Sequence, residues 1–153
     1  MTTGSVTPTV DPSLRRSYGW FMPITTRWMD NDIYGHINNV HYYSYFDTVA
    51  NTFLIQKCGL DIHHGAAIGY IVHSQCSYKQ GIAFPEAIEG GFRVNRIGNS
   101  SIQYGIGIFK SGENSAAAYG TFTHVFVDRA TETPVSIPEA MRPALEAMLA
   151  TEF

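Results

Sequence analysis

Cysteine is scarce in this chain, which has 153 residues and two cysteines, Cys58 and Cys76. Both lie in apolar stretches and form no C-x-x-C pair, so they indicate buried thiols in a reducing compartment rather than a disulfide framework. Charge is also scarce, at 15% of residues, and a net charge of −3 gives no electrostatic reason to expect nucleic-acid binding. A surface with so few charges favours partial cover by another subunit.

Long hydrophobic runs are missing as well. No segment approaches the roughly 20 apolar residues that a membrane span requires. The N-terminal segment MTTGSVTPTVDPSLRRS has no apolar run typical of a secretory signal, and its Thr, Ser, Gly and Pro content predicts a disordered leader over residues 1–17. We therefore expect a cytoplasmic protein with no membrane partner and a single domain over residues 18–153.

Several catalytic signatures are absent too. There is no G-x-S-x-G nucleophile elbow, and the Gly105–Gly107 pair lacks the later glycine of a dinucleotide-binding loop. His63 and His64 suggest a metal pair, but adjacent side chains diverge and no third ligand has suitable spacing. We expect a solvated loop there, with no metal and no cofactor in the protein.

The strongest pattern in the chain runs from residue 27 to residue 58. It begins in an aromatic and β-branched segment, residues 18–29, which predicts a strand that is bent or lies at a sheet edge because of Pro23. A polar turn with two aspartates, Asp30 and Asp32, follows directly. Because carboxylates beside a helix start are places where charge is controlled, this turn is the first candidate for a site.

The segment after the turn predicts one long helix. Asn38 and Asn39 are suited to its N-cap, because their side chains can accept hydrogen bonds from the first free backbone N–H groups. The helix is expected to continue to Lys57, and Gly59 can adopt the left-handed conformation that ends helices. Its apolar positions exceed a single stripe, so we expect it to be buried on most sides.

The rest of the chain has strand patterns separated by hairpin-turn compositions. A short terminal helix is expected after Pro138, interrupted by Pro143. A long apolar helix with one sheet available must be wrapped by that sheet, which predicts a single α+β domain with a sheet edge left for a second subunit. The four strands expected after the helix cover residues 67–80, 85–97, 100–110 and 116–128.

The pattern R-W-M-D-N-D-x-x-G-H-I-N-N-x-x-Y-x-x-Y-F-D, from Arg27 to Asp47, resembles the 4-hydroxybenzoyl-CoA thioesterase-like branch of the hotdog-fold acyl-CoA thioesterases. The resemblance implies a hotdog fold, in which a five-stranded antiparallel sheet wraps one long central helix. It also implies a homodimer, often doubled to a homotetramer, that hydrolyses an acyl-CoA to a free acid and CoA. The acyl group, and the choice between dimer and tetramer, stay open.

The same resemblance assigns roles within the turn. Asp32 matches the catalytic carboxylate of the family, as a general base or as a nucleophile, and the sequence does not decide which. The backbone N–H of Asn39 is expected to polarise the thioester carbonyl, aided by the helix dipole. Gly35 lets the backbone approach the acyl group. His36 is a candidate acid, base or orienting donor, or else a side chain packed in a dimer interface, and Asp32 taken alone also fits a turn carboxylate.

Further contacts to substrate are expected outside the turn. The segment 96–101 resembles the strand-turn-strand of the family that faces the CoA phosphates, although an ordinary hairpin with a polar tip has the same composition. The expected CoA-binding residues are Arg96, Ser100 and Ser101, and the expected acyl-site residues are Tyr43, His73 and Ser74.

Two other functions compete with hydrolysis. Hotdog enoyl-CoA hydratases also use an aspartate and a histidine after a turn, but at a different spacing and with a proline between them. A non-catalytic acyl-binding or oligomerisation module would keep the helix and the interface without needing the carboxylate. Retention of Asp32 at the helix entrance favours the enzyme.

Overall fold

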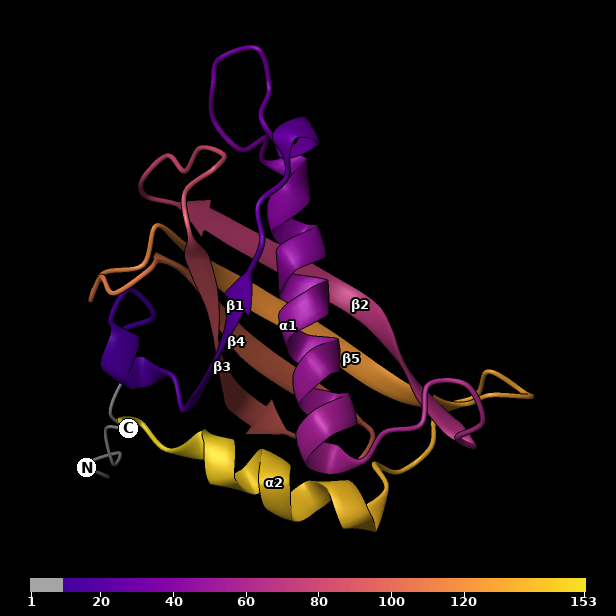
Figure 1. Cartoon of the computed structure of the whole chain (residues 1–153). Helices are drawn as coiled ribbons and strands as arrows, with labels where there is room; N and C mark the ends of the chain where they lie inside the picture. Colours follow the sequence, from indigo (N-terminus) through magenta and orange to yellow (C-terminus); the bar gives the residue numbers. More distant parts are fainter. Residues whose placement is uncertain (1–9) are drawn as a thin grey trace, which may run out of the picture.

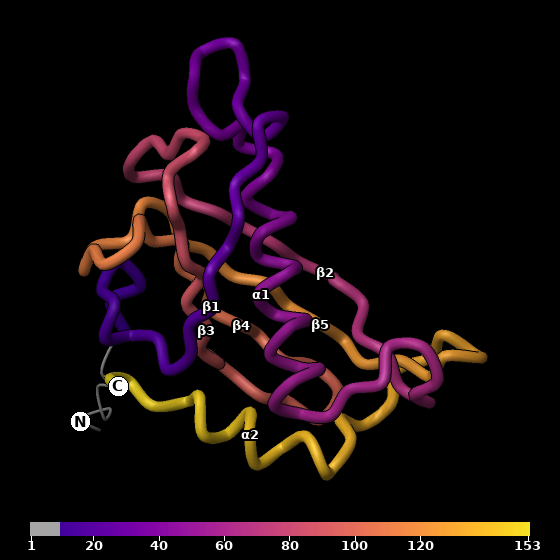
Figure 2. Tube along the Cα trace, in the orientation of Figure 1, coloured from indigo at the N-terminus to yellow at the C-terminus, as the bar shows by residue number. Residues whose placement is uncertain are grey.

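The computed structural model describes residues 10–153, which form one antiparallel sheet and one helix packed across it (Figure 1). The strand order in the sheet is β1-β3-β4-β5-β2, and α1 lies against one face of it (Figure 2). This confirms the α+β hotdog architecture, a 19-residue helix wrapped by five strands. The elements are β1 (Trp20–Ile24), α1 (Val40–Cys58), β2 (Ala67–Tyr78), β3 (Ile88–Ile97), β4 (Ser101–Lys110), β5 (Ala118–Asp128) and α2 (Arg142–Glu146).

The first strand is shorter than its composition predicts. It ends at Ile24, and residues 28–30 form a turn of 3-10 helix instead of continuing the strand. The cause is local, because the Asp30 carboxylate accepts hydrogen bonds from both the backbone N–H and the guanidinium of Arg27 and so bends the chain back.

The long helix is buried along one face only, so the expectation of burial on most sides is wrong for the single chain. The sheet covers one side of the helix, while apolar positions such as Val40 and Ile55 stay exposed. Gly90 allows the close approach of helix and sheet, because a Cβ there would overlap the side chain of Val49. The buried helix residues are Tyr42, Tyr45, Phe46, Val49, Ala50, Phe53, Leu54 and Cys58.

The core between helix and sheet contains a polar pair on β4 and β5. His124 is 2% exposed and its Nδ1 lies 3.0 Å from the hydroxyl of Tyr104. Burial lowers the pKa of His124 to about 4, so the ring is neutral in the folded protein at neutral pH. Cys58 is a buried free thiol, and Cys76 is a partly exposed one.

Both ends of the described chain pack on the sheet. Leu14 forms a β-bridge with Ser115, Arg15 pairs with Glu89, and Ser17 is buried. The disorder expected up to residue 17 is therefore wrong for residues 10–17, because these side chains find partners far along the sequence. The remainder of the expected leader, residues 1–9, lies outside the described residues.

The C-terminal segment is a run of short helical turns. Pro143 lies in the first turn of α2, where its missing N–H costs no helical hydrogen bond. The expected interruption of this helix at Pro143 is therefore wrong. The backbone N–H of Phe153 donates to the carbonyl of Arg16 at 2.7 Å, which ties the chain ends together. No helix within residues 10–153 is long and apolar enough to cross a membrane.

Candidate active site

The turn between β1 and α1 projects from one end of the molecule as a closed loop (Figure 1). The backbone N–H of Asp32 donates to the carbonyl of His36 at 2.9 Å, and Gly35 N–H donates to the carbonyl of Asp32 at 3.1 Å. Gly35 has φ of 84°, a conformation that glycine adopts without strain. The sequence places Gly35 correctly in a tight turn, and its proposed approach to an acyl group stays a prediction.

Asp32 is half-buried at the rim of this loop. One of its carboxylate oxygens, Oδ1, accepts the backbone N–H of Tyr34 at 2.9 Å, which is the turn-forming contact that its position alone suggests. The other oxygen, Oδ2, accepts no hydrogen bond from any residue in the range 10–153. One oxygen therefore fixes the side chain while the other stays free for a ligand or water.

Asp30 lies at the base of the same turn and is completely buried. Its carboxylate accepts the hydroxyl of Tyr45 at 2.7 Å and the backbone N–H of Arg27 at 2.9 Å, and its other oxygen lies 2.9 Å from the Arg27 guanidinium. Burial opposes its charge, but the hydrogen bonds from Tyr45 and Arg27 outweigh burial and lower the pKa of Asp30. Asp30 is therefore a structural carboxylate whose hydrogen-bonding partners all come from the chain itself.

The start of α1 lies next to Asp30. The Asp30 carbonyl accepts the Asn38 N–H at 2.9 Å, and the Asn38 side chain caps the helix by accepting the Val40 N–H at 3.2 Å. Asn39 is the residue before the helix, but its side chain makes no capping bond. Its backbone N–H has no acceptor within the described part of the chain. That amide is the group expected to hold a thioester carbonyl, and it is free to do so.

A cavity of about 310 Å³ opens beside the helix start. His36 packs against the chain at Gly81, where a Cβ would lie 2.9 Å from its ring, and the Tyr78 hydroxyl donates to the Asn39 carbonyl at 3.3 Å. The Tyr42 and Tyr78 rings meet edge to face at 5.0 Å, and burial raises the pKa of each to about 12, so neither is an acid or base near neutral pH. The lining residues are His36, Ile37, Asn39, Tyr42, Tyr78, Lys79, Gln80 and Gly81.

Sequence reasoning missed the wall of this cavity that follows β2. Tyr78 ends β2, Lys79 and Gly81 follow it, and no motif marks these residues as neighbours of the turn. Their position follows from strand register, because Tyr78 pairs with Ala118 at the end of the sheet that lies under the helix start. Asn31 was also missed as an anchor, although its side chain accepts the Phe84 N–H at 2.9 Å.

The predicted acyl-site residues outside the turn do not line this cavity. Tyr43 of α1 is 37% exposed and stacks on Phe122 of β5. His73 and Ser74 lie in the middle of β2, where they are exposed. Within one chain they are therefore not brought together with Asp32, and their expected contacts with substrate remain predictions.

The predicted CoA-binding residues lie at the opposite end of the molecule from the turn (Figure 1). Arg96 is exposed near the end of β3, Ser100 lies in the β3–β4 turn, and Ser101 begins β4. Arg142 donates to the carbonyls of this turn, which is therefore held near the C-terminal segment. A single chain does not join these residues to Asp32.

His63 and His64 occupy an exposed turn, as expected. Both of their backbone N–H groups donate to the carboxylate of Asp61. In residues 10–153 no group of three or more His, Cys, Asp or Glu side chains is placed to hold a metal ion.

Comparison with known proteins identifies the family. The family model of the thioesterase-like superfamily matches residues 26–145, most of the chain. This protein belongs to the thioesterase-like superfamily. The match contains the whole turn and confirms the resemblance drawn from Arg27 to Asp47, and a thioester hydrolase is what that membership leads one to expect.

Solved structures show the same fold. The PA5185 protein of Pseudomonas aeruginosa strain PAO1 is 52% identical, covers 92% of this chain and 99% of its own, and has a TM-score of 0.89. A thioesterase of Thermus thermophilus, solved with coenzyme A and Zn, is 23% identical with a TM-score of 0.72, covering 87% of this chain and 96% of its own. The Bacillus subtilis protein YsmA is 23% identical over 88 residues, which are 58% of this chain and 59% of that protein.

Proposed function

We propose that this protein hydrolyses an acyl-CoA thioester to the free acid and CoA, with Asp32 as base or nucleophile. One observation carries the proposal: a half-buried carboxylate with a free oxygen and a helix-start amide without an acceptor belong to one turn that Asp30 holds rigid. Thioester hydrolysis needs these two components, a base or nucleophile and a donor to the developing oxyanion.

Both roles of Asp32 lead to the same products, the free acid and CoA. As a base, Asp32 takes a proton from water, the hydroxide adds to the thioester carbonyl, and collapse of the adduct breaks the carbon–sulfur bond. As a nucleophile, its free oxygen forms an anhydride with the acyl group, CoA leaves as a thiolate, and water then cleaves the anhydride. In both cases the Asn39 N–H holds the oxyanion, and the thiolate finally takes up the proton.

We also propose that a second copy of the chain completes the site. β2 is an edge strand that pairs only with β5 within the described residues, and its Tyr70, Ile71 and Val72 are exposed. Large apolar side chains near Asp32 are also open to solvent, with Ile33 95% exposed and Trp28 83% exposed. Apolar surface of this extent favours a protein partner.

Register gives that partner a direction. Tyr78 lies at the end of β2 beside the helix start, whereas Ala67 lies at the end that holds the β3–β4 turn, because Ser101 pairs with Val125 and Val125 with Tyr70. Antiparallel pairing of β2 with a second β2 would set the Ala67 end of one copy beside the Tyr78 end of the other. The CoA-binding role proposed for Arg96, Ser100 and Ser101 thus requires the partner subunit.

Thiol release from acetyl-, hexanoyl-, palmitoyl- and benzoyl-CoA tests the activity and identifies the acyl preference. We expect release from at least one of them, and a loss of about 10³-fold in kcat for Asp32→Asn. Asp61→Asn is a matched control, because Asp61 also accepts backbone N–H groups in an exposed turn. An absence of release from every substrate would contradict hydrolysis and leave the non-catalytic acyl-binding module.

A further inference from the structure

The connection between β2 and β3, residues 79–87, joins the sheet to the turn between β1 and α1. It is anchored to the sheet where it begins, because the backbone N–H groups of Lys79 and Gln80 both donate to the carbonyl of Ala117, at 2.8 and 3.0 Å. Ile82 in the middle of the connection is completely buried and belongs to the main core. The connection is therefore part of the packed structure and not a loose loop.

The second half of the connection is fixed as well. The backbone N–H of Glu86 donates to the carbonyl of Ala83 at 2.8 Å, and the Ala83 N–H donates to the Glu86 carboxylate at 3.0 Å. The other oxygen of that carboxylate lies 3.2 Å from the Lys110 ammonium. Because the connection is held at both of its ends, it can fix the position of a loop that contacts it.

The turn is attached to this connection by one hydrogen bond on each of its two arms. The backbone N–H of Ile37 donates to the carbonyl of Ile82 at 2.7 Å, and the backbone N–H of Phe84 donates to the side-chain Oδ1 of Asn31 at 2.9 Å. Asn31 and Ile37 also face each other in an antiparallel β-bridge. The two arms are thus held against each other and against residues 82 and 84 of the connection.

The two attachments differ in kind. The bond of Ile37 joins two backbone groups, so it does not depend on the side chain at that position. The bond of Asn31 uses a side-chain oxygen, and alanine at this position would leave the Phe84 N–H without that acceptor. The Trp28 and Phe84 rings also meet edge to face, but Trp28 is 83% exposed and its ring is mostly in solvent. The attachment of the arm that contains Asp32 therefore depends mainly on one side chain.

We propose that Asn31 is a positioning residue, which sets the place of the Asp32 carboxylate relative to the Asn39 N–H. This inference rests on the hydrolysis proposed for Asp32. Placement matters because a shift of about 1 Å between reacting groups can lower a rate on the order of 100-fold. A neutral amide suits this position, since a carboxylate between Asp30 and Asp32 would add a like charge beside both.

The test compares Asn31→Ala with Asn31→Asp, which keeps an oxygen where Asn31 accepts the Phe84 N–H. Thiol release from the acyl-CoA that the wild type hydrolyses fastest gives kcat and KM. We expect Asn31→Ala to lower kcat about 20-fold and to change KM by less than about twofold, because the reacting groups are displaced while the other substrate contacts remain. Asn31→Asp should restore kcat to within about threefold of the wild type, its added charge preventing full recovery.

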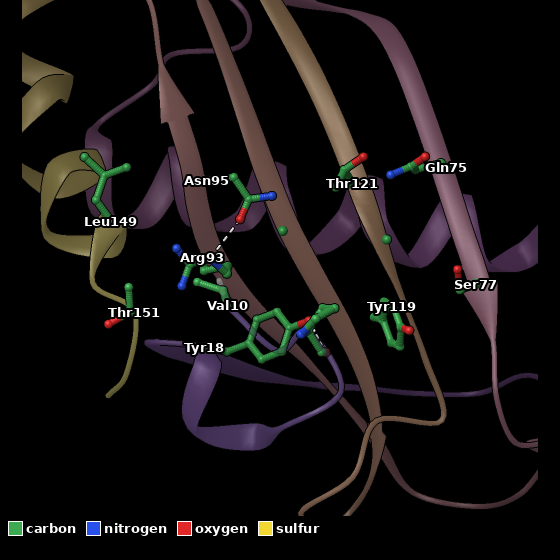
Figure 3. Close-up of a pocket in the computed structure, with 13 residues that line it drawn as sticks. Val10, Tyr18, Gln75, Ser77, Arg93, Asn95, Tyr119, Thr121, Leu149 and Thr151 are labelled. Atoms are coloured by element: carbon green, nitrogen blue, oxygen red, sulfur yellow. Dashed lines mark hydrogen bonds between the residues drawn. The ribbon is translucent and has the colours of Figure 1, made fainter. Parts of the chain in front are cut away.

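Asn95→Ala is the matched control. The Asn95 side-chain oxygen also accepts one hydrogen bond, from the Arg93 guanidinium at 2.8 Å (Figure 3). Asn95 lines a cavity of about 380 Å³, and none of the residues that line this cavity also lines the one beside the helix start. The control thus removes an acceptor of the same type away from the turn, and kcat should stay within about twofold of the wild type.

Amide hydrogen exchange of the ¹⁵N-labelled full-length protein, followed by NMR, tests the attachment without activity. In Asn31→Ala the N–H groups of Asp32, Gly35 and Phe84 should exchange at least about tenfold faster than in the wild type, whereas those of α1 keep their rates.

Unchanged exchange in the turn, equal losses of kcat in Asn31→Ala and Asn31→Asp, or a loss as large in Asn95→Ala would each overturn the proposal. An absence of thiol release from the wild type would instead contradict hydrolysis itself, and the exchange rates would still decide whether Asn31 holds the arm.

Discussion

The turn at the helix start has a base and a rim, and each contains one aspartate. Asp30 at the base is fully buried and bound by Arg27 and Tyr45, whereas Asp32 at the rim is half-buried with one oxygen left free. The two residues are separated by one position, so the contrast comes from their surroundings and not from their chemistry. Residues of the chain itself donate hydrogen bonds to both oxygens of Asp30, whereas one oxygen of Asp32 stays free for a ligand or water.

This contrast separates stability from reactivity. A carboxylate that accepts several hydrogen bonds is held in its charged form and accepts a proton poorly. The same hydrogen bonds hold its donor groups in place. Asp30 thereby orders Arg27, the helix start through Asn38, and the loop that carries Asp32. Variants that act on one level and spare the other should therefore be possible.

The largest expected effect on stability comes from Asp30→Asn. It removes the charge that Arg27 and Tyr45 share at a buried position, and we expect the free energy of unfolding to fall by about 3 kcal/mol. Asp32→Asn should change it by less than about 0.5 kcal/mol, because that side chain makes one turn contact that an amide oxygen can also make. Urea unfolding at one fixed protein concentration measures both, and equal losses would erase the distinction between base and rim.

The second prediction concerns the free backbone N–H of Asn39 at the helix start. Asn39 has φ of −54°, which is compatible with proline, so Asn39→Pro removes the free N–H with little strain. We expect kcat to fall about 100-fold, as when an oxyanion donor is lost, whereas Asn39→Ala keeps the amide and should retain activity. Circular dichroism checks that both variants keep the helix. Equal activities would show that this amide does not hold the oxyanion.

The position of Asp32 was easier to predict from the sequence than the contacts of Asp30. Asp32, Gly35 and Asn39 are close together in sequence and match a pattern, so their place at a helix start follows from local rules. Asp30, by contrast, binds Tyr45 as well as its neighbour Arg27, and Tyr45 reaches it only because the turn folds back over the helix it precedes. A hydrogen bond between residues that are far apart in sequence depends on tertiary packing, which local patterns do not contain.

The same limit explains the errors elsewhere. Residues 10–17 have the composition of a disordered leader, yet Arg15 pairs with Glu89 and the Arg16 carbonyl accepts the N–H of Phe153. Partners at such separations outweigh local preference. The α+β class was predictable, because a long apolar helix and one sheet leave few ways to bury both, whereas the hotdog fold itself was implied by the resemblance of residues 27–47.

A smaller effect isolates one hydrogen bond of the base. Tyr45→Phe removes the hydroxyl that Asp30 accepts, and we expect a loss of about 1.5 kcal/mol in unfolding free energy at pH 7. The pKa of Asp30 lies below its ordinary value, so its contribution is complete above pH 3.8 and disappears as pH falls through the folded-state pKa. The gap between the two proteins should therefore narrow below pH 3.8, and a gap that is independent of pH would assign the loss to packing.

The smallest effect separates the two asparagines that local sequence rules treat alike. Asn38 caps the helix through its side chain, which accepts the N–H of Val40, whereas the Asn39 side chain makes no such bond. Asn38→Ala should thus lower the unfolding free energy by about 1 kcal/mol, and Asn39→Ala by only a few tenths. Thermal and urea unfolding of both alanine variants measures this difference. The reverse order would mean that Asn39 provides the cap, and that the free amide of the rim is held by a side chain that also stabilises the helix.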